Sequence, residues 1–271
     1  MGKGVGGNEL DKIFKYFNQM FDKVIEKSLT LLRKTAIVND DLSIVSRKKR
    51  LKFIKKIDNE LKINFDETFN FVGLLGFWKS KPIRLIPIIE SKKPGKKTPD
   101  YLSVYKGKRI LIECKSSSFN ETDSEKLKRR IQKRISKAKK QLKTYSNLPG
   151  LCIFQTDNEE IFQQLTALSD LIQEKIDDDE NNLAGIIFTY RKDNEEIGKI
   201  NLNFTLFLNF RSTILLPKGF VQDILDGKGG LLIAAKKGDK FPFPLMEKIC
   251  KHYGINIDLN KLEQQFKNKN T

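Results

Sequence analysis

Residues 98–116 read TPDYLSVYKGKRILIECKS, and this stretch decides how the centre of the chain folds. Two runs rich in aliphatic, β-branched and aromatic residues, Tyr101–Tyr105 and Arg109–Glu113, flank a short segment that contains Gly107. Such runs on either side of a glycine-bearing turn are typical of two antiparallel strands. The sequence therefore predicts a β-hairpin over these residues.

Charged side chains meet at the open end of this hairpin. Folding about Gly107 pairs Tyr101 with Glu113, which brings Asp100 beside Glu113. Because side chains alternate between the two faces of a strand, Lys115 lies on the same face as Glu113. We therefore expect Asp100, Glu113 and Lys115 to converge at one end of an otherwise apolar hairpin.

This combination of charges is suited to metal-assisted chemistry on phosphates. Two adjacent carboxylates repel each other unless a cation lies between them. Mg²⁺ takes a few carboxylates and completes its shell with water and phosphate oxygens. A neighbouring lysine can orient an attacking water or stabilise charge that develops on a phosphate. A surface salt-bridge group would use the same residue types, but the dense apolar run around Glu113 favours a buried, catalytic cluster.

The spacing of these residues resembles the motif of a known family. Pro99-Asp100, twelve intervening residues and Glu113-Cys114-Lys115 resemble the PD-(D/E)xK nuclease superfamily, which includes restriction endonucleases, Holliday-junction resolvases and RecB or lambda-exonuclease nucleases. The resemblance covers about residues 64 to 157 and implies a restriction-endonuclease-like α/β core. It implies that Asp100, Glu113 and the carbonyl of Cys114 bind Mg²⁺, for which Mn²⁺ would substitute. Lys115 would then position or activate the water that attacks a DNA phosphodiester.

A third acid comes from the segment before the first expected strand. Residues 64–78, NFDETFNFVGLLGFW, are predicted to form a helix with an apolar face. The phrase Phe65-Asp66-Glu67 resembles the helix that precedes the first core strand in Mrr-like members. That resemblance implies a metal-binding or water-positioning role for Glu67. An ordinary exposed glutamate would give the same pattern, and Glu60 and Glu90 are alternatives.

Two neighbouring segments offer contacts to a substrate. The loop SKKPGKKT at residues 91–98 directly precedes Asp100 and carries four lysines that would grip a phosphate backbone, namely Lys92, Lys93, Lys96 and Lys97. A long helix predicted after the Thr122–Glu125 capping box carries Gln141 and Tyr145 one turn apart. This pair resembles the extra motif of the RecB and lambda-exonuclease branch, which helps to hold the substrate or the active-site network. A plain solvated loop and a chance match on a Lys/Gln-rich helix are the alternative interpretations.

The positive charge of the chain lies in the half that contains the acidic cluster. The 271 residues include 51 Lys and Arg against 34 Asp and Glu, a formal net charge of +17. Residues 1–150 hold 36 of these basic residues and 16 of the acidic ones, whereas residues 151–271 hold 15 and 18. Such a surplus favours nucleic acid as the partner, and the resemblance to the nuclease superfamily implies that it is DNA. An anionic membrane surface is the competing interpretation, and no spanning segment supports it.

Scarce residue types exclude other chemistry. His252 is the only histidine, which leaves too few ligands for histidine-rich zinc sites and histidine-dependent nucleases. Cys114, Cys152 and Cys250 form no CxxC pair, so neither a zinc ribbon nor an iron–sulfur cluster is indicated. We expect these cysteines to be buried and reduced in a cytoplasmic protein, since no secretory signal is visible.

The predicted order helix–strand–hairpin–helix–strand–helix–strand gives an α/β fold with a mixed sheet flanked by helices. We expect an N-terminal helical region over residues 1–62, a nuclease core over 63–192 and a small α+β accessory region over 193–271. The expected function is a Mg²⁺-dependent DNA endonuclease of the restriction or defence type. An exonuclease, a branched-DNA resolvase and a non-catalytic nucleic-acid-binding module remain open. A homodimer is expected if both DNA strands are cut.

Overall fold

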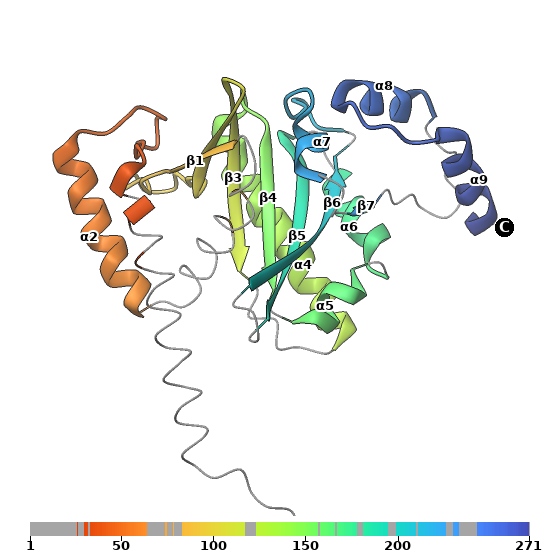
Figure 1. Ribbon diagram of the computed structural model, residues 1–271, viewed down its shortest axis with the longest axis horizontal. Coiled ribbons are helices and arrows are strands. Elements are labelled where there is room, and N and C mark those ends of the chain that lie inside the picture. The colour runs from red at the N-terminus through yellow and green to blue at the C-terminus, as the bar shows by residue number, and fades with distance from the viewer. Residues whose placement is uncertain are drawn as a thin grey trace, which may run out of the picture.

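The computed structural model describes residues 26, 30–31, 33–63, 74, 78, 83–116, 123–156, 158–165, 167–177, 181–194, 199–209, 211–225, 230–232 and 243–270. Over this part of the chain, a seven-stranded mixed sheet forms the centre of the molecule, with the strands adjacent in the order β1 to β7 (Figure 1). The pairs β1–β2, β2–β3 and β5–β6 are antiparallel, and β3–β4, β4–β5 and β6–β7 are parallel. The predicted α/β fold class, a mixed sheet flanked by helices, is confirmed.

The elements follow the chain in sequence order. The strands are β1 Ile83–Pro87, β2 Tyr101–Tyr105, β3 Lys108–Ser116, β4 Gly150–Thr156, β5 Leu183–Asn194, β6 Lys199–Leu208 and β7 Gly230–Leu232. The helices are α2 Arg47–Ile63, α4 Ser124–Leu142, the 3₁₀ turn η1 Lys143–Tyr145, α5 Glu159–Gln164, α6 Ser169–Asp177, α7 Phe220–Leu225, α8 Phe243–Tyr253 and α9 Leu259–Asn270.

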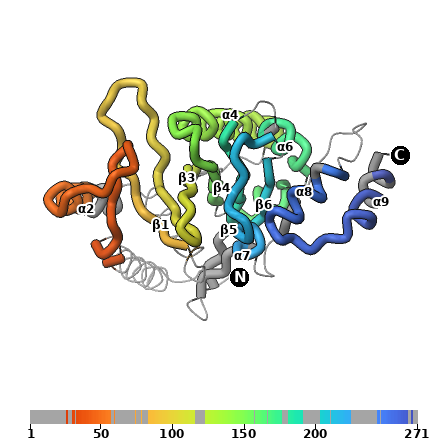
Figure 2. Tube along the Cα trace, turned by 90° about the horizontal axis from the view of Figure 1, so that it is seen from above, coloured from red at the N-terminus to blue at the C-terminus, as the bar shows by residue number. Residues whose placement is uncertain are grey.

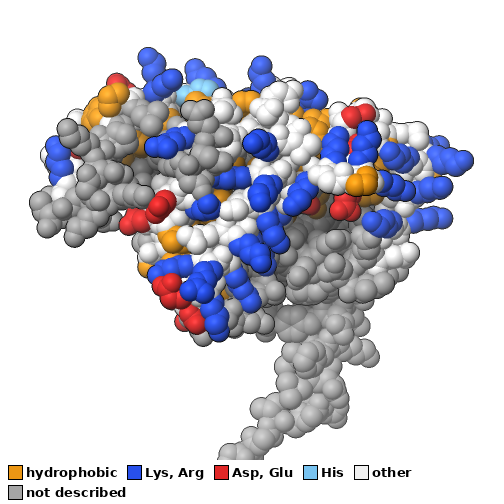
Figure 3. Space-filling model, turned by 180° about the vertical axis from the view of Figure 1, so that it is seen from behind, with side chains coloured by type: hydrophobic (Ala, Val, Ile, Leu, Met, Phe, Trp, Pro, Cys, Tyr) orange, Lys and Arg blue, Asp and Glu red, His pale blue; other side chains and the backbone are white. Residues whose placement is uncertain are grey.

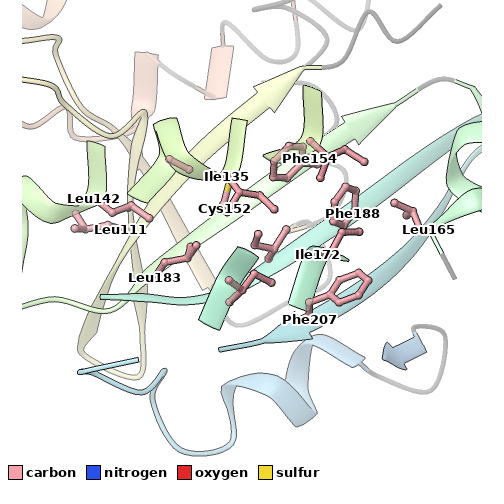
Figure 4. Packing of buried hydrophobic residues seen from close by; sticks show 14 of the residues in the cluster. Leu111, Ile135, Leu142, Cys152, Phe154, Leu165, Ile172, Leu183, Phe188 and Phe207 are labelled. Carbon is pink, nitrogen blue, oxygen red and sulfur yellow. The ribbon is translucent and has the colours of Figure 1, made fainter. Parts of the chain in front are cut away.

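Helices cover both faces of the sheet, which gives three layers (Figure 2). On β4, Cys152 and Phe154 face the layer of α4, α5 and α6, whereas Leu151 and Ile153 face the layer of α7 and α8. Strands buried on both faces consist of nearly continuous apolar residues, as β4 does. Figure 4 shows the packing on the α4 side, where the Phe154 and Phe188 rings stack with centroids 4.7 Å apart. The two apolar layers hold the central strands, and therefore the site on β3, in a fixed position.

The β2–β3 hairpin turns over two residues. Lys106 and Gly107 have φ angles of +46° and +77°, and positive φ at both central residues is what a type I′ turn requires. Lys108 therefore joins β3 and pairs with Tyr105. The register predicted from the sequence is wrong by one residue, because a turn centred on Gly107 would have left Lys108 outside the strand.

The observed register still brings the two acids together. Tyr101 pairs with Ile112, not with Glu113 as predicted. One step further along the ladder, Asp100 comes opposite Glu113. Leu111 packs on the α4 side of the sheet and Ile112 on the other, as the predicted alternation requires. The side chains of β3 thus lie on the predicted faces.

The C-terminal part of the chain continues the same sheet. β6 and β7 lie beyond β5, and α7 and α8 contribute to the apolar layer on the face opposite α4. The hydroxyl of Tyr105, at the turn of the hairpin, donates a hydrogen bond of 2.5 Å to Oδ2 of Asp223 on α7. The three expected domain limits remain predictions. None of the helices described is both long enough and apolar enough to cross a membrane.

Asn182 ties the end of α4 to the sheet, and its loss should weaken the fold. Its Nδ2 donates to the carbonyl oxygens of Leu142, Tyr145 and Leu148 at 3.0, 3.1 and 2.9 Å. Asn182→Ala leaves these carbonyls without that donor, so we expect the free energy of unfolding to fall by about 2 kcal/mol. Urea denaturation measures the change. Asn147→Ala, at an exposed turn residue, is the matched control and should change stability by less than about 0.5 kcal/mol. Equal effects of the two substitutions would contradict this role.

Candidate active site at the open end of the hairpin

The chain brings the predicted charged residues together where β2 begins and β3 ends. Asp100 immediately precedes β2, and its Oδ2 accepts a hydrogen bond of 2.6 Å from the backbone N–H of Cys114. This bond fixes the carboxylate against β3. Glu113 and Lys115 are two residues apart on β3, so they share the face that looks toward α4. The structure thus confirms the predicted proximity of these three charged groups.

Lys115 is held by two partners. Its Nζ forms an ion pair with Oε1 of Glu113. The same Nζ donates a hydrogen bond of 2.9 Å to Oε1 of Gln141, which lies near the end of α4. The side chain of Glu113 is 1% exposed, whereas that of Lys115 is 15% exposed. The ammonium group is therefore positioned by a buried carboxylate, and the lysine side chain is partly exposed to solvent.

One oxygen of Glu113 lacks a protein partner. Oε2 is buried and makes no hydrogen bond with any residue in the described part of the chain. Leaving a buried carboxylate oxygen without a partner costs about 1–3 kcal/mol or more. A buried, unpaired oxygen beside a second carboxylate fits a site that binds a cation, because the cation would supply the missing interaction.

The raised pKa values of the two acids also favour a site that binds a cation. Burial, followed by the charge of Asp100, raises the pKa of Glu113 to about 8. Burial also raises the pKa of Asp100, against the hydrogen bond from Cys114. For Lys115, desolvation lowers the pKa, but the Glu113 and Asp100 carboxylates outweigh it and the net shift is upward. The lysine is therefore protonated at neutral pH. Burial makes it unfavourable for both neighbouring acids to carry a negative charge at the same time.

The number of acids limits the type of metal that fits. Among the described residues, no group of three or more His, Cys, Asp or Glu side chains is arranged to hold an ion. Two carboxylates suit Mg²⁺, which keeps several waters and shares its shell with substrate phosphates. They do not suit a structural zinc site, which needs four protein ligands. The backbone of Cys114 adjoins the pair through its N–H group, which donates to Asp100, and the metal-binding role of its carbonyl remains a prediction.

The lysine loop before Asp100 is closed on itself. Thr98 is buried, and its Oγ1 accepts a hydrogen bond of 2.9 Å from the backbone N–H of Ser91. Lys96 forms an ion pair of 3.4 Å with Asp40, and its Nζ lies 5.6 Å from the ring centroid of Tyr145. Two predicted substrate contacts, Lys96 and Tyr145, therefore touch each other. The other three lysines of the loop, Lys92, Lys93 and Lys97, are exposed to solvent.

Only one residue of the predicted Gln141–Tyr145 pair contacts the charged cluster. Gln141 contacts Lys115, but α4 ends at Leu142, and Tyr145 lies in the 3₁₀ turn that follows. The Tyr145 hydroxyl is buried without a hydrogen bond to any described residue. Burial raises the pKa of this hydroxyl to about 12. The structure therefore connects Gln141 to the charged cluster and does not connect Tyr145 to it.

The candidates for a third acid fall outside or at the edge of this cluster. Glu67 lies outside the described residues, and so does the side chain of Glu60. Glu90 is exposed, and its charge contributes to the raised pKa of Asp100. A third acid for the site therefore remains a prediction.

Sequence reasoning missed two residues that support the site. Asp40 pairs with Lys96 from 56 residues away, and Asn182 binds the carbonyls at the end of α4 from about 40 residues away. Asp40 sits in an Asn-Asp-Asp segment that signals only a turn, and Asn182 follows an acidic turn. Nothing in either local pattern indicates the distant partner.

Comparison with known proteins adds little to this geometry. No family model matches the chain, and no curated protein matches it. The structure of Pyrococcus furiosus SfsA in complex with Ca²⁺ is similar over 50% of this chain and 60% of that chain, with 15% sequence identity and a TM-score of 0.25. The match thus spans less than two thirds of the SfsA chain. At this TM-score the likeness carries no argument about the site.

Proposed function

We propose that the protein is a Mg²⁺-dependent DNA endonuclease of the PD-(D/E)xK kind, with restriction or defence as its expected task. The observation that carries the proposal is the buried Oε2 of Glu113, which lies unpaired beside Asp100 and next to a lysine held by two partners. Burying these charges is costly unless they are paired, hydrogen-bonded or bound to a metal ion. The strongly basic first half of the chain supports a polyanionic substrate.

Each group of residues would have a distinct role in cleavage. Asp100 and Glu113, together with the carbonyl of Cys114 and the carboxylate of Glu67, would hold the metal ion. Mg²⁺, for which Mn²⁺ would substitute, supplies charge that stabilises the phosphate as its bond to the leaving oxygen breaks. Lys115 would orient the attacking water and stabilise negative charge on the phosphate. The basic loop would hold the DNA backbone in register with the site.

Cleavage of plasmid DNA tests the proposal directly. Supercoiled plasmid is incubated with the purified chain in Mg²⁺, in Mn²⁺ and in EDTA, and the products are separated on agarose. We expect nicked or linear DNA with either metal and intact plasmid in EDTA. If no form of DNA or RNA is cut with any divalent ion, the protein is a binding module and the proposed function is wrong.

A second task within the same superfamily is favoured by one contact. The hydrogen bond from Lys115 to Gln141 places the glutamine of the Gln-x-x-x-Tyr pair in the charged cluster. That pair resembles the exonuclease branch, in which cutting starts from a DNA end. Covalently closed and linear forms of one DNA molecule separate the two tasks. Degradation of the linear form alone would favour an exonuclease over an endonuclease.

Gln141→Ala should reduce cleavage without abolishing it. The amide oxygen accepts one of the hydrogen bonds that position Lys115, while the ion pair with Glu113 remains. We expect the rate to fall about 10- to 100-fold, the range for loss of a group that orients a functional side chain. Single-turnover cleavage of a labelled duplex measures it. Gln132→Ala, a half-buried glutamine elsewhere on α4, is the matched control. A Gln141→Ala rate equal to that of the control would contradict the positioning role.

A further inference from the structure

The outer surface of α4 is strongly basic. α4 contains nine Lys or Arg residues and a single acid, Glu125, in its first turn. Six of the basic residues are exposed, and five of these follow one another at intervals of four, three, four and three positions, namely Lys126, Arg130, Lys133, Lys137 and Lys140. This spacing places them in one row along the helix. Figure 3 looks onto this face, which Lys and Arg side chains cross in a band.

Neighbouring acids compensate little of this charge. In the first turn of α4, Asp123 and Glu125 form ion pairs with Lys126 and Lys128. Lys133, Lys137 and Lys140 make no ion pair with any residue that the structure describes. These three neighbouring cations repel one another and are stabilised when a polyanion neutralises them. The surface is therefore suited to an extended anionic partner.

The buried side of α4 argues against a membrane as that partner. A helix that lies on a bilayer needs an exposed apolar face to insert. The apolar residues of α4 are instead all 0% exposed beneath the helix, namely Leu127, Ile131, Ile135, Ala138 and Leu142. No described residue of α4 offers a large apolar side chain to the surface. What remains exposed is charge without a hydrophobic anchor.

The composition of the row also indicates which form of nucleic acid fits. Proteins that hold single strands stack bases on aromatic side chains, and α4 contains no aromatic residue. Backbone contacts by Lys and Arg alone suit a duplex whose bases stay stacked. The row runs from Lys126 to Lys140, which is about 21 Å of helix and matches about six base-pair steps of duplex.

We propose that the exposed row of α4 tracks the phosphate backbone of double-stranded DNA and leads it to the carboxylate site. Lys140, at one end of the row, adjoins Gln141, which contacts Lys115. The row would bind DNA at several phosphates outside the reacting one, so it acts on affinity and not on the chemical step. This inference rests on the proposed function for the choice of DNA as the partner.

The test measures binding in the absence of cleavage. The triple variant Lys133→Ala, Lys137→Ala, Lys140→Ala is made in the full chain, and binding of a labelled duplex is followed by fluorescence anisotropy in EDTA at several salt concentrations. Loss of three phosphate contacts should make the negative slope of log K against log salt less steep by about 2.7. Binding should weaken roughly 100-fold at physiological salt. Alanine at exposed helix positions does not impair folding, because it is the best helix former.

A matched control separates the place of the charges from their number. The variant Lys248→Ala, Lys251→Ala, Lys261→Ala removes the same charge from exposed positions of α8 and α9. The slope of log K against log salt for this variant should differ from that of the unmodified chain by no more than about 0.9, the change expected for one phosphate contact. Equal losses in the two variants would overturn the proposal, and so would an unchanged slope in the α4 variant. The same holds if the α4 variant loses binding to phosphatidylserine vesicles and keeps its DNA binding.

The readout also separates this inference from the proposed function. If DNA binds through α4 in EDTA but is never cut with metal, the nuclease assignment is wrong and the DNA-binding role of α4 is still supported. If the triple variant cuts plasmid with Mg²⁺ and keeps the full salt slope, the nuclease stands and the α4 surface is wrong.

Discussion

Lys115→Met is expected to stop DNA cleavage almost completely while leaving DNA binding in place. The ammonium group of Lys115 is held between the buried carboxylate of Glu113 and the half-buried side-chain amide of Gln141. It remains protonated, since its pKa is raised. Removing a group that orients water or stabilises developing charge lowers rates by about 10²–10⁴-fold. We therefore expect single-turnover cleavage to fall by about 10³-fold.

Methionine is chosen so that the loss of charge is not confused with loss of structure. It keeps most of the length and apolar stem of the lysine, and the raised pKa of Glu113 allows that acid to be neutral when its partner is gone. Lys108→Ala, at the exposed opposite end of β3, is the control and should cut normally. Circular dichroism and anisotropy verify folding and binding. Cleavage by Lys115→Met at the rate of the control would remove Lys115 from the mechanism.

The core of the site was accessible from the sequence because it is built locally. Asp100 and Glu113 are joined by one short turn, and strand alternation alone places Lys115 beside Glu113. The register error shows the limit of that reasoning. Whether Lys108 belongs to the turn depends on the positive φ of Lys106, and lysine has no particular preference for that conformation. The acids still meet, because a shift of one pair along the ladder leaves Asp100 next to Glu113.

The supporting shell could not be predicted, because it depends on contacts across the fold. Asn182 binds three carbonyls at the end of α4, and Asp40 holds Lys96 of the loop. Each is an ordinary turn residue in its own segment. Tyr145 shows the opposite case, since helical spacing predicts that it lies beside Gln141, but α4 gives way to a 3₁₀ turn and the hydroxyl ends without a partner. Local patterns thus predicted the charged groups and Gln141, but not the distant residues that hold α4 and the lysine loop in place.

A bound divalent metal ion is expected to raise the thermal stability of the protein, and this effect can be measured without any cleavage activity. A ligand that binds only the folded state raises the free energy of unfolding by about 2.7 kcal/mol when its concentration is 100 times its dissociation constant. If Asp100 and Glu113 hold a divalent ion, saturating Mn²⁺ should raise the melting temperature by about 5 °C or more. Glu113→Gln has the same shape and lacks the charge. We expect this variant to show no metal-dependent shift and to cut DNA at least 10³-fold more slowly.

The comparison is made by calorimetry in Mn²⁺ and in EDTA, with Glu247→Gln as the control. Glu247 is exposed on α8, so its substitution removes the same charge and should leave the metal-dependent shift intact. The difference between the two variants isolates the buried pair from weak binding of metal to the surface. A full shift in Glu113→Gln would mean that the ion binds elsewhere. The unpaired Oε2 would then be a structural cost with no role in metal binding, and the case for a nuclease would lose its main support.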